Sequence, residues 1–291
     1  MIALRDLLLT LRPHQWVKNG FVLMGLLFGH AWNDPTSVRH ILGAFAAFCL
    51  VSSAVYVFND LIDRDRDRRH PEKRNRPIAA GRIAMPTALG LGCLVGLTGL
   101  ALAAWAGTGV LIIVVSYMVM NAVYSVRLKH VVILDVFIIS AGFMLRILAG
   151  TWGVGIPPSH WLLFCGMMVT LFLGFAKRRA EMGAVGEGDQ AYHRAVLAQY
   201  TPLLLDTFIA VTAMGVIISY SLYTMSPETI TVHGTDNLIF TVPFIVYGLF
   251  RYVFLLHASG SGGDPSRDLF RDLHLLGAVI GWLGVTLWML V

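Results

Sequence analysis

Long apolar segments alternate with short polar ones along almost the whole chain. A segment of roughly 17 to 25 apolar residues is long enough to cross the hydrocarbon core of a bilayer as a helix. The sequence contains nine such segments, of which the first is the weakest. They cover residues 18–33, 41–61, 84–106, 108–126, 131–150, 159–176, 201–223, 237–257 and 274–291. The pattern therefore predicts an all-α, polytopic membrane protein with nine transmembrane helices.

The basic residues test this set of helices, because Lys and Arg collect in the cytoplasmic loops of membrane proteins. All of the 22 basic residues except Arg39 and Arg146 fall on one side of the predicted spans. The richest loop joins the second and third helices and runs from Arg64 to Arg82. We therefore expect a cytoplasmic N-terminus, an external C-terminus and chemistry on the cytoplasmic side.

Composition supports the same class of protein. Of the 291 residues, 56% are hydrophobic and only 13% are charged, which lies outside the usual range of soluble domains. The loops of one side account for the formal charge of +5, so nucleic acid is not an expected partner. No internal repeat and no linker of distinct composition divides the sequence. We expect one helical domain over residues 1–291.

An acidic cluster follows the second apolar segment. Asn59, Asp60, Asp63 and Asp67 continue that helix out of the membrane. At about 100° per residue, the three aspartates fall within about 60° of one another, with Asn59 about 40° further round. Like charges on one helix face repel each other, and a divalent cation relieves that repulsion. Oxygen ligands favour Mg²⁺, which takes its remaining ligands from water and substrate phosphate.

Basic residues follow the acidic cluster directly, in the stretch 70–77 (HPEKRNRP). Lys73 and Arg76 are of the type that binds phosphate. A run of alternating Asp and Arg can instead be a solvated surface, and Asp65, on the opposite side of the helix, fits that description. The other aspartates share one helix face, lie at the membrane boundary and are followed by basic residues. Together these features favour a site for metal and phosphate.

The acidic cluster resembles the first signature of the UbiA superfamily of intramembrane prenyltransferases. Asn59, Asp60, Asp63 and Asp67 match that signature, NDxxDxxxD, in full. The resemblance implies nine transmembrane helices around a cavity that opens sideways to lipid and is capped on the cytoplasmic side. It also implies that the three aspartates are catalytic, and that together with Asn59 they bind Mg²⁺ and, through it, a diphosphate.

The chain departs from the usual members of this family after the sixth helix. Where they carry a second acidic motif, DxxxD, this sequence has the stretch 175–181, FAKRRAE. Lys and Arg favour phosphate over a second Mg²⁺, which indicates an anionic second substrate. Lys177 and Arg178 are therefore candidate substrate ligands. The alternative is that these residues only anchor a helix end on the cytoplasmic side.

Other segments narrow the resemblance to the decaprenyl-phosphate phosphoribosyltransferase branch of the family. These segments are 12–19 (RPHQWVKN), 124–129 (YSVRLK) with Asp135, 142–146 (GFMLR), 193–197 (HRAVL) and 262–265 (GGDP). The branch implies transfer of 5-phosphoribose from phosphoribosyl pyrophosphate to a polyprenyl phosphate, with release of diphosphate. It also implies a bacterial inner membrane and a product that leads to the arabinose donor of the cell wall.

Further polar residues in or near the spans are candidate substrate ligands in this scheme. Lys18 and Lys129 suit one phosphate or the other, and Tyr124 begins a polar turn that ends at Asp135. Asp135 could instead be a structural partner for a nearby Lys or Arg. Arg146 lies deep in an apolar helix, where an unpaired charge is costly. We expect it to face the cavity or to extend to the interface.

Two other functions remain open from the sequence. One is transfer of an isoprenyl group from its diphosphate to an aromatic or other acceptor, in which case Asp264, Asp268 and Asp272 could form a second metal site. The other is a transporter or lipid-binding protein without catalysis, although transporter sites usually lie near the bilayer midplane. The oligomeric state is also open, a homo-oligomer included.

Overall fold

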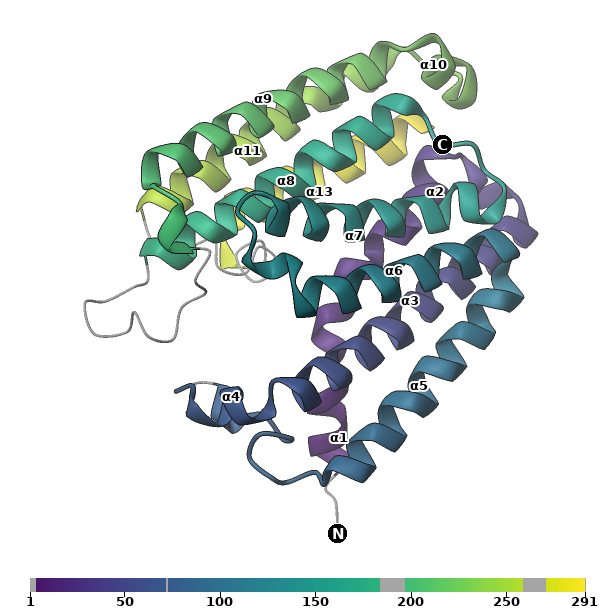
Figure 1. Cartoon of the computed structure of the whole chain (residues 1–291). Helices are drawn as coiled ribbons and strands as arrows, with labels where there is room; N and C mark the ends of the chain where they lie inside the picture. Colours follow the sequence, from purple (N-terminus) through teal and green to yellow (C-terminus); the bar gives the residue numbers. More distant parts are fainter. Residues whose placement is uncertain (1–3, 72, 184–196, 259–270, 291) are drawn as a thin grey trace. The chain divides into compact units, whose positions relative to one another are not determined.

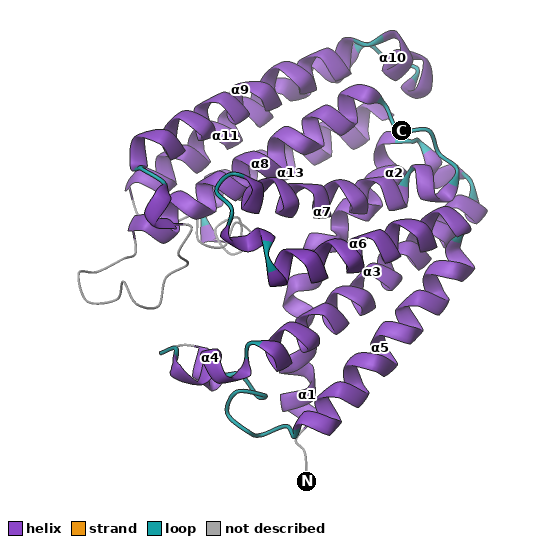
Figure 2. Cartoon of the chain, viewed as in Figure 1, coloured by secondary structure: helices purple, strands orange, loops and turns teal. Residues whose placement is uncertain are grey.

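The computed structural model describes residues 4–71, 73–183, 197–258 and 271–290. In these ranges the chain is helical and contains no strand (Figure 2). Eight of the described helices are long and apolar enough to cross a membrane. The protein is therefore an all-α, multi-span membrane protein, and this part of the sequence prediction is confirmed.

The eight spans correspond to the second to ninth predicted segments, with ends that differ by at most seven residues. They are α3 (Pro35–Ile62), α5 (Met85–Ala106), α6 (Thr108–Val126), α7 (Leu134–Gly150), α8 (His160–Gly183), α9 (Pro202–Met225), η8 with α11 (Asn237–Thr241 and Val242–Ala258), and α13 (Leu273–Leu290). The short α-helices are α1 (Leu4–Leu11), α2 (Met24–Phe28), α4 (Arg64–Arg69) and α10 (Pro227–His233). The remaining 3₁₀ helices lie between the α-helices of the chain. They are η1 (Pro13–Leu23), η2 (Ala31–Asn33), η3 (Lys73–Asn75), η4 (Leu128–His130), η5 (Trp152–Val154) and η7 (Leu197–Gln199).

The first predicted span, residues 18–33, is not a continuous α-helix. The 3₁₀ helix η1 occupies its first part and α2 only five residues of its second. The segment is packed closely, because a Cβ atom on Gly25 would lie 1.7 Å from the carbonyl oxygen of Gly150. The backbone of α2 therefore contacts that of α7 directly. Trp16 fixes η1 to α3 by donating from Nε1 to Ser53 Oγ at 3.0 Å.

The chain divides into two compact units. Unit 1 comprises Met1–Arg127 and Leu145–Pro157, and unit 2 comprises Leu128–Met144 and Pro158–Val291. In unit 1, α5 runs along α3 (Figure 1). The face of α5 that meets α3 is made of small residues, which let two helices approach closely. These residues are Ala88, Gly92, Gly96, Gly99 and Ala103.

This close approach makes the glycines of α5 unequal in their tolerance of substitution. A Cβ on Gly99 would lie 2.7 Å from Val51 Cγ2, whereas a Cβ on the exposed Gly90 would meet nothing within 4 Å. Alanine improves helix propensity equally at both sites. We therefore expect Gly99→Ala to lower stability by about 1–3 kcal/mol through overpacking, and Gly90→Ala to leave it unchanged or higher. Thermal unfolding of the two variants in detergent would compare them.

In unit 2, α9 runs along α8 and shares an apolar core with it (Figure 1). Phe172 and Phe175 from α8 are buried there against Leu205 and Ile209 from α9. The helix α9 begins at a complete N-cap, in which the Thr201 side chain accepts from the Leu204 amide at 3.2 Å. The core fixes the register of the two helices and with it the positions of the polar residues near the end of α8.

Candidate functional site

The acidic cluster begins at the end of α3 and continues into α4. Asp63 joins the two helices: its amide donates to the Asn59 carbonyl at 2.9 Å, and its carbonyl accepts from the Asp67 amide at 2.8 Å. Helical phase therefore carries through the junction, as the spacing of the aspartates requires. Asp60 and Asp67 are 4% and 3% exposed, whereas Asp63 is half-buried.

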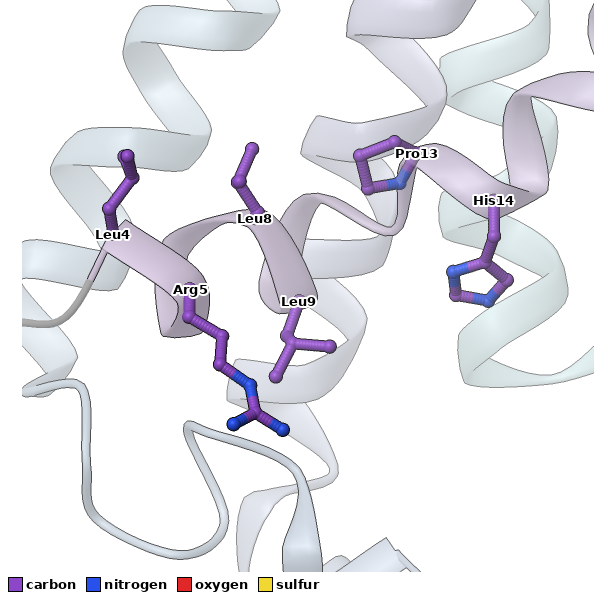
Figure 3. Close-up of a pocket in the computed structure, with 6 residues that line it drawn as sticks. All are labelled: Leu4, Arg5, Leu8, Leu9, Pro13 and His14. Carbon is purple, nitrogen blue, oxygen red and sulfur yellow. The ribbon is translucent and has the colours of Figure 1, made fainter.

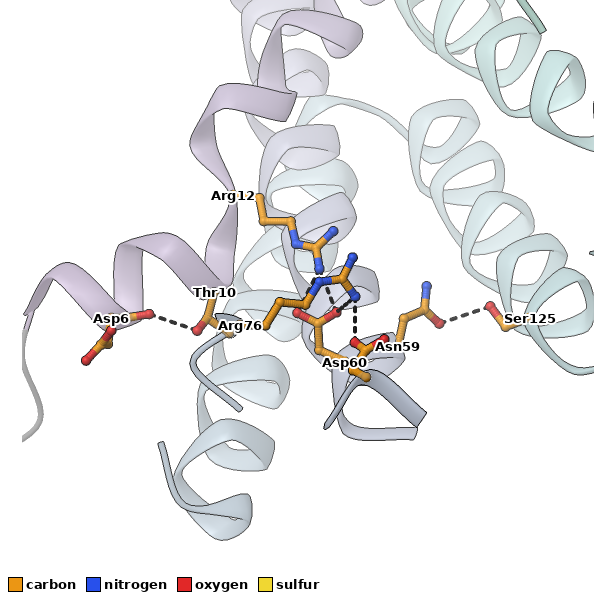
Figure 4. Close-up of polar contacts among 8 residues, drawn as sticks. Asp6, Thr10, Arg12, Asn59, Asp60, Arg76 and Ser125 are labelled. Carbon is orange, nitrogen blue, oxygen red and sulfur yellow. Dashed lines mark hydrogen bonds and ion pairs between the residues drawn. The ribbon is translucent and has the colours of Figure 1, made fainter. Parts of the chain in front are cut away.

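Two arginines face the buried carboxylates (Figure 4). Arg76 donates from Nη1 to Asp60 Oδ1 at 3.0 Å and to Asp67 Oδ2 at 2.6 Å, so that one guanidinium joins both aspartates. Arg12 donates from Nη2 to the two oxygens of Asp60, at 2.6 and 2.8 Å, and its guanidinium lies over the Tyr56 ring. The two negative charges are thus balanced by two positive ones, which offsets the cost of burying them.

The loop that carries Arg76 is folded by its own apolar residues. Ile78 and Ile83 are buried in a small core with residues of α3 and α5. Arg82 closes the loop by donating from Nε to Asp6 of α1 at 3.0 Å. The basic loop is therefore held by a small apolar core and by the bond to α1. Arg76 has a defined position beside the carboxylates of Asp60 and Asp67.

The donor chemistry of the cluster fits a hard divalent cation. Asp60 and Asp67 point at a common position, since one nitrogen of Arg76 bonds to both, and oxygen-only donors suit Mg²⁺. Asn59 instead accepts from Ser125 Oγ at 2.9 Å. Among the described residues, no group of three or more His, Cys, Asp or Glu side chains is arranged to hold a metal ion. The metal role of the four predicted ligands stays a prediction.

Three further candidate ligands of unit 1 lie on separate elements. Lys18 is half-buried on η1, Lys73 is exposed on η3, and Tyr124 is half-buried near the end of α6. Two of them come directly before a residue with a defined contact: Lys18 precedes the buried Asn19, and Tyr124 precedes Ser125. Their proposed part in substrate binding remains a prediction.

Arg146 is buried inside unit 1, with 6% exposure, and does not extend to an interface. It donates from Nε to Asn19 Oδ1 at 2.7 Å and from Nη2 to the Tyr117 hydroxyl at 3.0 Å. Its guanidinium lies over the rings of Tyr117 and Phe48. These contacts fix η1 against α6 and α7, so Arg146 has a structural role that the sequence did not reveal. Its substrate-binding role is untested.

In unit 2, Asp135 and Arg178 form a buried ion pair. Arg178 is 1% exposed and donates from Nε to Asp135 Oδ2 at 2.8 Å. Arg178 also pairs with Glu181, and Asp135 Oδ1 accepts from the Tyr200 hydroxyl at 3.0 Å. Asp135 is therefore a structural partner of Arg178, which is one of the two roles that the sequence left open for it. A part for either residue in substrate binding is a separate prediction.

Two other basic candidates of unit 2 are half-buried: Lys129 on η4 and Lys177 on α8. The next residue of the basic stretch, Arg179, pairs with Asp206 of α9 at 2.9 Å. The three basic residues of this stretch therefore differ in burial: Arg178 is buried, whereas Lys177 and Arg179 are partly exposed. A simple row of interfacial charges would not place an arginine in the core.

Several residues singled out in the sequence lie outside the described ranges. They are His193, Arg194, Gly262, Gly263, Asp264, Pro265 and Asp268. Asp272 is described, and it accepts from Arg251 Nη2 at 2.6 Å and from the Leu275 amide at the start of α13. The hydrogen bond from Arg251 lowers the pKa of Asp272 to about 2. Asp272 is thus an ionised helix cap within an ion pair.

A shallow, mostly apolar pocket lies beside α1 (Figure 3). It is lined by Leu4, Arg5, Leu8, Leu9, Pro13 and His14. Leu4, Leu8 and Leu9 are exposed, which suits a short helix at the membrane interface. None of the carboxylates of the acidic cluster lines this pocket, so we assign no chemistry to it.

The structure adds three polar residues that sequence reasoning left without a role: Arg12, Asn19 and Tyr200. Arg12 and Asn19 fall in the segment 12–19, but nothing in their spacing identifies their partners. Tyr200 precedes the Thr-Pro start of α9 and carries no motif. Only the folded chain brings them to Asp60, Arg146 and Asp135 respectively.

Comparisons with known proteins agree on one family. The model of the UbiA prenyltransferase family matches residues 20–273. A decaprenyl-phosphate phosphoribosyltransferase from Mycolicibacterium smegmatis is 31% identical, over 96% of this chain and 90% of the relative. The protein of the same name from Corynebacterium glutamicum is 34% identical, over 94% and 83% respectively. A solved UbiA homolog from Archaeoglobus fulgidus, bound to GPP and Mg²⁺, shares the fold with a TM-score of 0.73 at 17% identity, over 98% of each chain.

Proposed function

Because the chain belongs to the UbiA prenyltransferase family, we propose that it transfers 5-phosphoribose from phosphoribosyl pyrophosphate to decaprenyl phosphate. The observation that carries this proposal is the similarity to curated decaprenyl-phosphate phosphoribosyltransferases over nearly the full length of both chains. The products are decaprenylphosphoryl-5-phosphoribose and diphosphate. In organisms that build an arabinan, this product would supply the arabinose donor of the cell wall.

The chemistry accounts for the types of residue in the site. A phosphate oxygen of the lipid attacks the anomeric carbon of the ribose, and the bond from that carbon to diphosphate breaks, with its electron pair leaving on the diphosphate. Negative charge therefore grows on the leaving oxygens, where fixed cations lower the barrier most. The attacking phosphate is ionised at neutral pH, so the reaction requires no general base.

Asp60, Asp63, Asp67 and Asn59 would hold Mg²⁺, which when bound neutralises charge on the diphosphate. Two observations support this: the carboxylate oxygens of Asp60 and Asp67 that meet at Arg76, and the Mg²⁺ of the Archaeoglobus fulgidus relative with the same fold. Arg76 would then lie beside the diphosphate together with Lys73. Lys18, Tyr124, Lys129, Asp135, Arg146, Lys177 and Arg178 are the further proposed substrate ligands.

We also propose that the chain forms one UbiA-type domain, 1–291, with nine membrane crossings. The ninth crossing would be η1 with α2, eleven and five residues long. At about 2.0 Å per residue for a 3₁₀ helix and 1.5 Å for an α-helix, they rise about 30 Å, the thickness of the hydrocarbon core. An odd number of crossings agrees with a cytoplasmic N-terminus and an external C-terminus. The cavity would open to the lipid of the inner membrane under a cytoplasmic cap.

A transfer assay tests this function directly. It combines purified protein, labelled phosphoribosyl pyrophosphate, Mg²⁺ and decaprenyl phosphate. We expect a labelled lipid that forms only when all components are present. A second reaction, with geranyl diphosphate as donor and aromatic acceptors, tests isoprenyl transfer, which the GPP-bound relative makes the main alternative. A protein that prenylates acceptors but forms no labelled lipid would overturn the proposal.

Arg76 gives the sharpest prediction for the proposed diphosphate site. Arg76→Ala should reduce kcat/KM about 10- to 100-fold, the value of a charge-assisted hydrogen bond. Arg74→Ala is the matched control, because Arg74 is an exposed arginine of the same loop. We expect the control to stay within about twofold of the wild type, as surface substitutions usually do. Equal losses in both variants would mean that only the total charge of the loop matters.

A further inference from the structure

The turn before α7 contains an unusual backbone conformation. Ile133 has φ of +68°, in the left-handed region. A β-branched residue is a genuine outlier there, and such a conformation costs of the order of 1–3 kcal/mol unless its surroundings hold it. The Ile133 side chain is 39% exposed, so packing of that side chain does not account for the conformation. Something else must fix the backbone.

Backbone bonds close this turn, from the Leu134 amide to the Val132 carbonyl at 2.7 Å and from the Val136 and Phe137 amides to the Ile133 carbonyl at 3.0 Å. Tyr200 adds the side-chain contact that ties the turn to the rest of unit 2. Its hydroxyl accepts a hydrogen bond from the Ile133 amide at 2.7 Å and donates one to Asp135 Oδ1 at 3.0 Å. The second carboxylate oxygen of Asp135 accepts from the buried Arg178. Burial raises the pKa of Tyr200 to about 12, so the hydroxyl keeps its proton at neutral pH and remains a donor to Asp135. A continuous chain of hydrogen bonds thus runs from the core of unit 2 to the strained peptide.

The strained peptide lies in the same turn as Lys129. The amide of Val131 donates to the Leu128 carbonyl at 3.2 Å, and the amide of Asp135 donates to the Val131 carbonyl at 3.0 Å. The backbone is therefore hydrogen-bonded on both sides of Ile133. A rotation at Ile133 would redirect the whole segment that precedes it, and with it the ammonium group of Lys129.

We propose that Tyr200 is a positioning residue that holds the Lys129 turn in place for an anionic phosphate substrate. The proposal rests on the proposed function, in which Lys129 binds a phosphate of the donor or of the lipid. Tyr200 touches neither substrate. It acts through the Ile133 backbone, and its partners Asp135 and Arg178 fix its own orientation.

The test uses Tyr200→Phe, which removes only the hydroxyl. We expect the KM of phosphoribosyl pyrophosphate or of decaprenyl phosphate to rise about five- to tenfold, the factor that corresponds to about one hydrogen bond, with kcat within about twofold. Deuterium uptake of the peptide covering residues 128–134 should rise as well. Adding Ile133→Gly should restore most of the KM, because glycine adopts a positive φ without strain.

Tyr220→Phe is the matched control. Tyr220 is also buried in unit 2, and its hydroxyl is bonded to Thr241 and Trp282, so its loss should lower stability without changing either KM. The proposal is overturned if Tyr200→Phe leaves both KM values unchanged, or if the double variant is no better than Tyr200→Phe alone. A wild-type protein without phosphoribosyl transfer would instead overturn the proposed function, while the deuterium uptake, which needs no substrate, still reports on the contact between Tyr200 and Ile133.

Discussion

Replacing Asp60 with asparagine is expected to reduce kcat about 100- to 1,000-fold, the usual effect of losing a group that stabilises developing charge. Asp60 is the carboxylate that both arginines of the site contact. The substitution keeps the shape of the side chain but removes its negative charge. The proposed Mg²⁺ site therefore loses a ligand, while Arg12 and Arg76 lose the charge that balances them.

Two measurements separate this effect from misfolding. The Asp60→Asn protein should elute as wild type on size exclusion, and it should lose the Mg²⁺-dependent rise in melting temperature that we expect of the wild type. Asp65→Asn is the control, since Asp65 is 83% exposed and its ion pair with Arg68 is 3.7 Å long. Wild-type turnover in Asp60→Asn would remove the metal and diphosphate role from the cluster.

The second large effect concerns stability. Asp135→Asn removes one partner of an ion pair in which Arg178 is 1% exposed and Asp135 fully buried. Leaving a buried charge without its partner typically costs about 3–5 kcal/mol. Glu181 still pairs with Arg178, so we expect a loss near the lower end, about 3 kcal/mol. Thermal or denaturant unfolding in detergent would measure it.

The double variant Asp135→Asn with Arg178→Met distinguishes a purely structural role of the Asp135–Arg178 pair from a role in substrate binding. The second substitution removes the buried charge that Asp135→Asn leaves without its partner, so stability should largely return. If Asp135 or Arg178 also binds substrate, activity should stay low although the protein is stable. Asp206→Asn, which breaks the partly exposed pair with Arg179, is the control and should cost less than about 1 kcal/mol. Equal losses from Asp135→Asn and the control would contradict a buried-pair effect.

The spans were predictable because membrane insertion depends on local properties of the sequence. A helix such as α5 needs only a sufficient length of apolar residues, and the predicted 84–106 differs from Met85–Ala106 by one residue. The segment 18–33 shows the limit of this reasoning. It is the weakest of the predicted spans, and in the fold it is divided between η1 and α2, with Gly25 packed against the backbone of Gly150.

The acidic signature was also readable from the sequence alone, because helical phase places Asp60 and Asp67 on one face whatever surrounds them. The partners of the buried charged residues could not be predicted from the sequence. Arg12 is 48 residues from Asp60, Arg178 is 43 from Asp135, and Arg146 is 127 from Asn19. Which charge meets which depends on how helices pack, and packing is decided by side chains distant from both members of the pair. The sequence by itself therefore determined the membrane class, the spans from 41 onward and the carboxylates of the site, whereas the tertiary structure alone decided how those carboxylates are neutralised and which residues hold them in place.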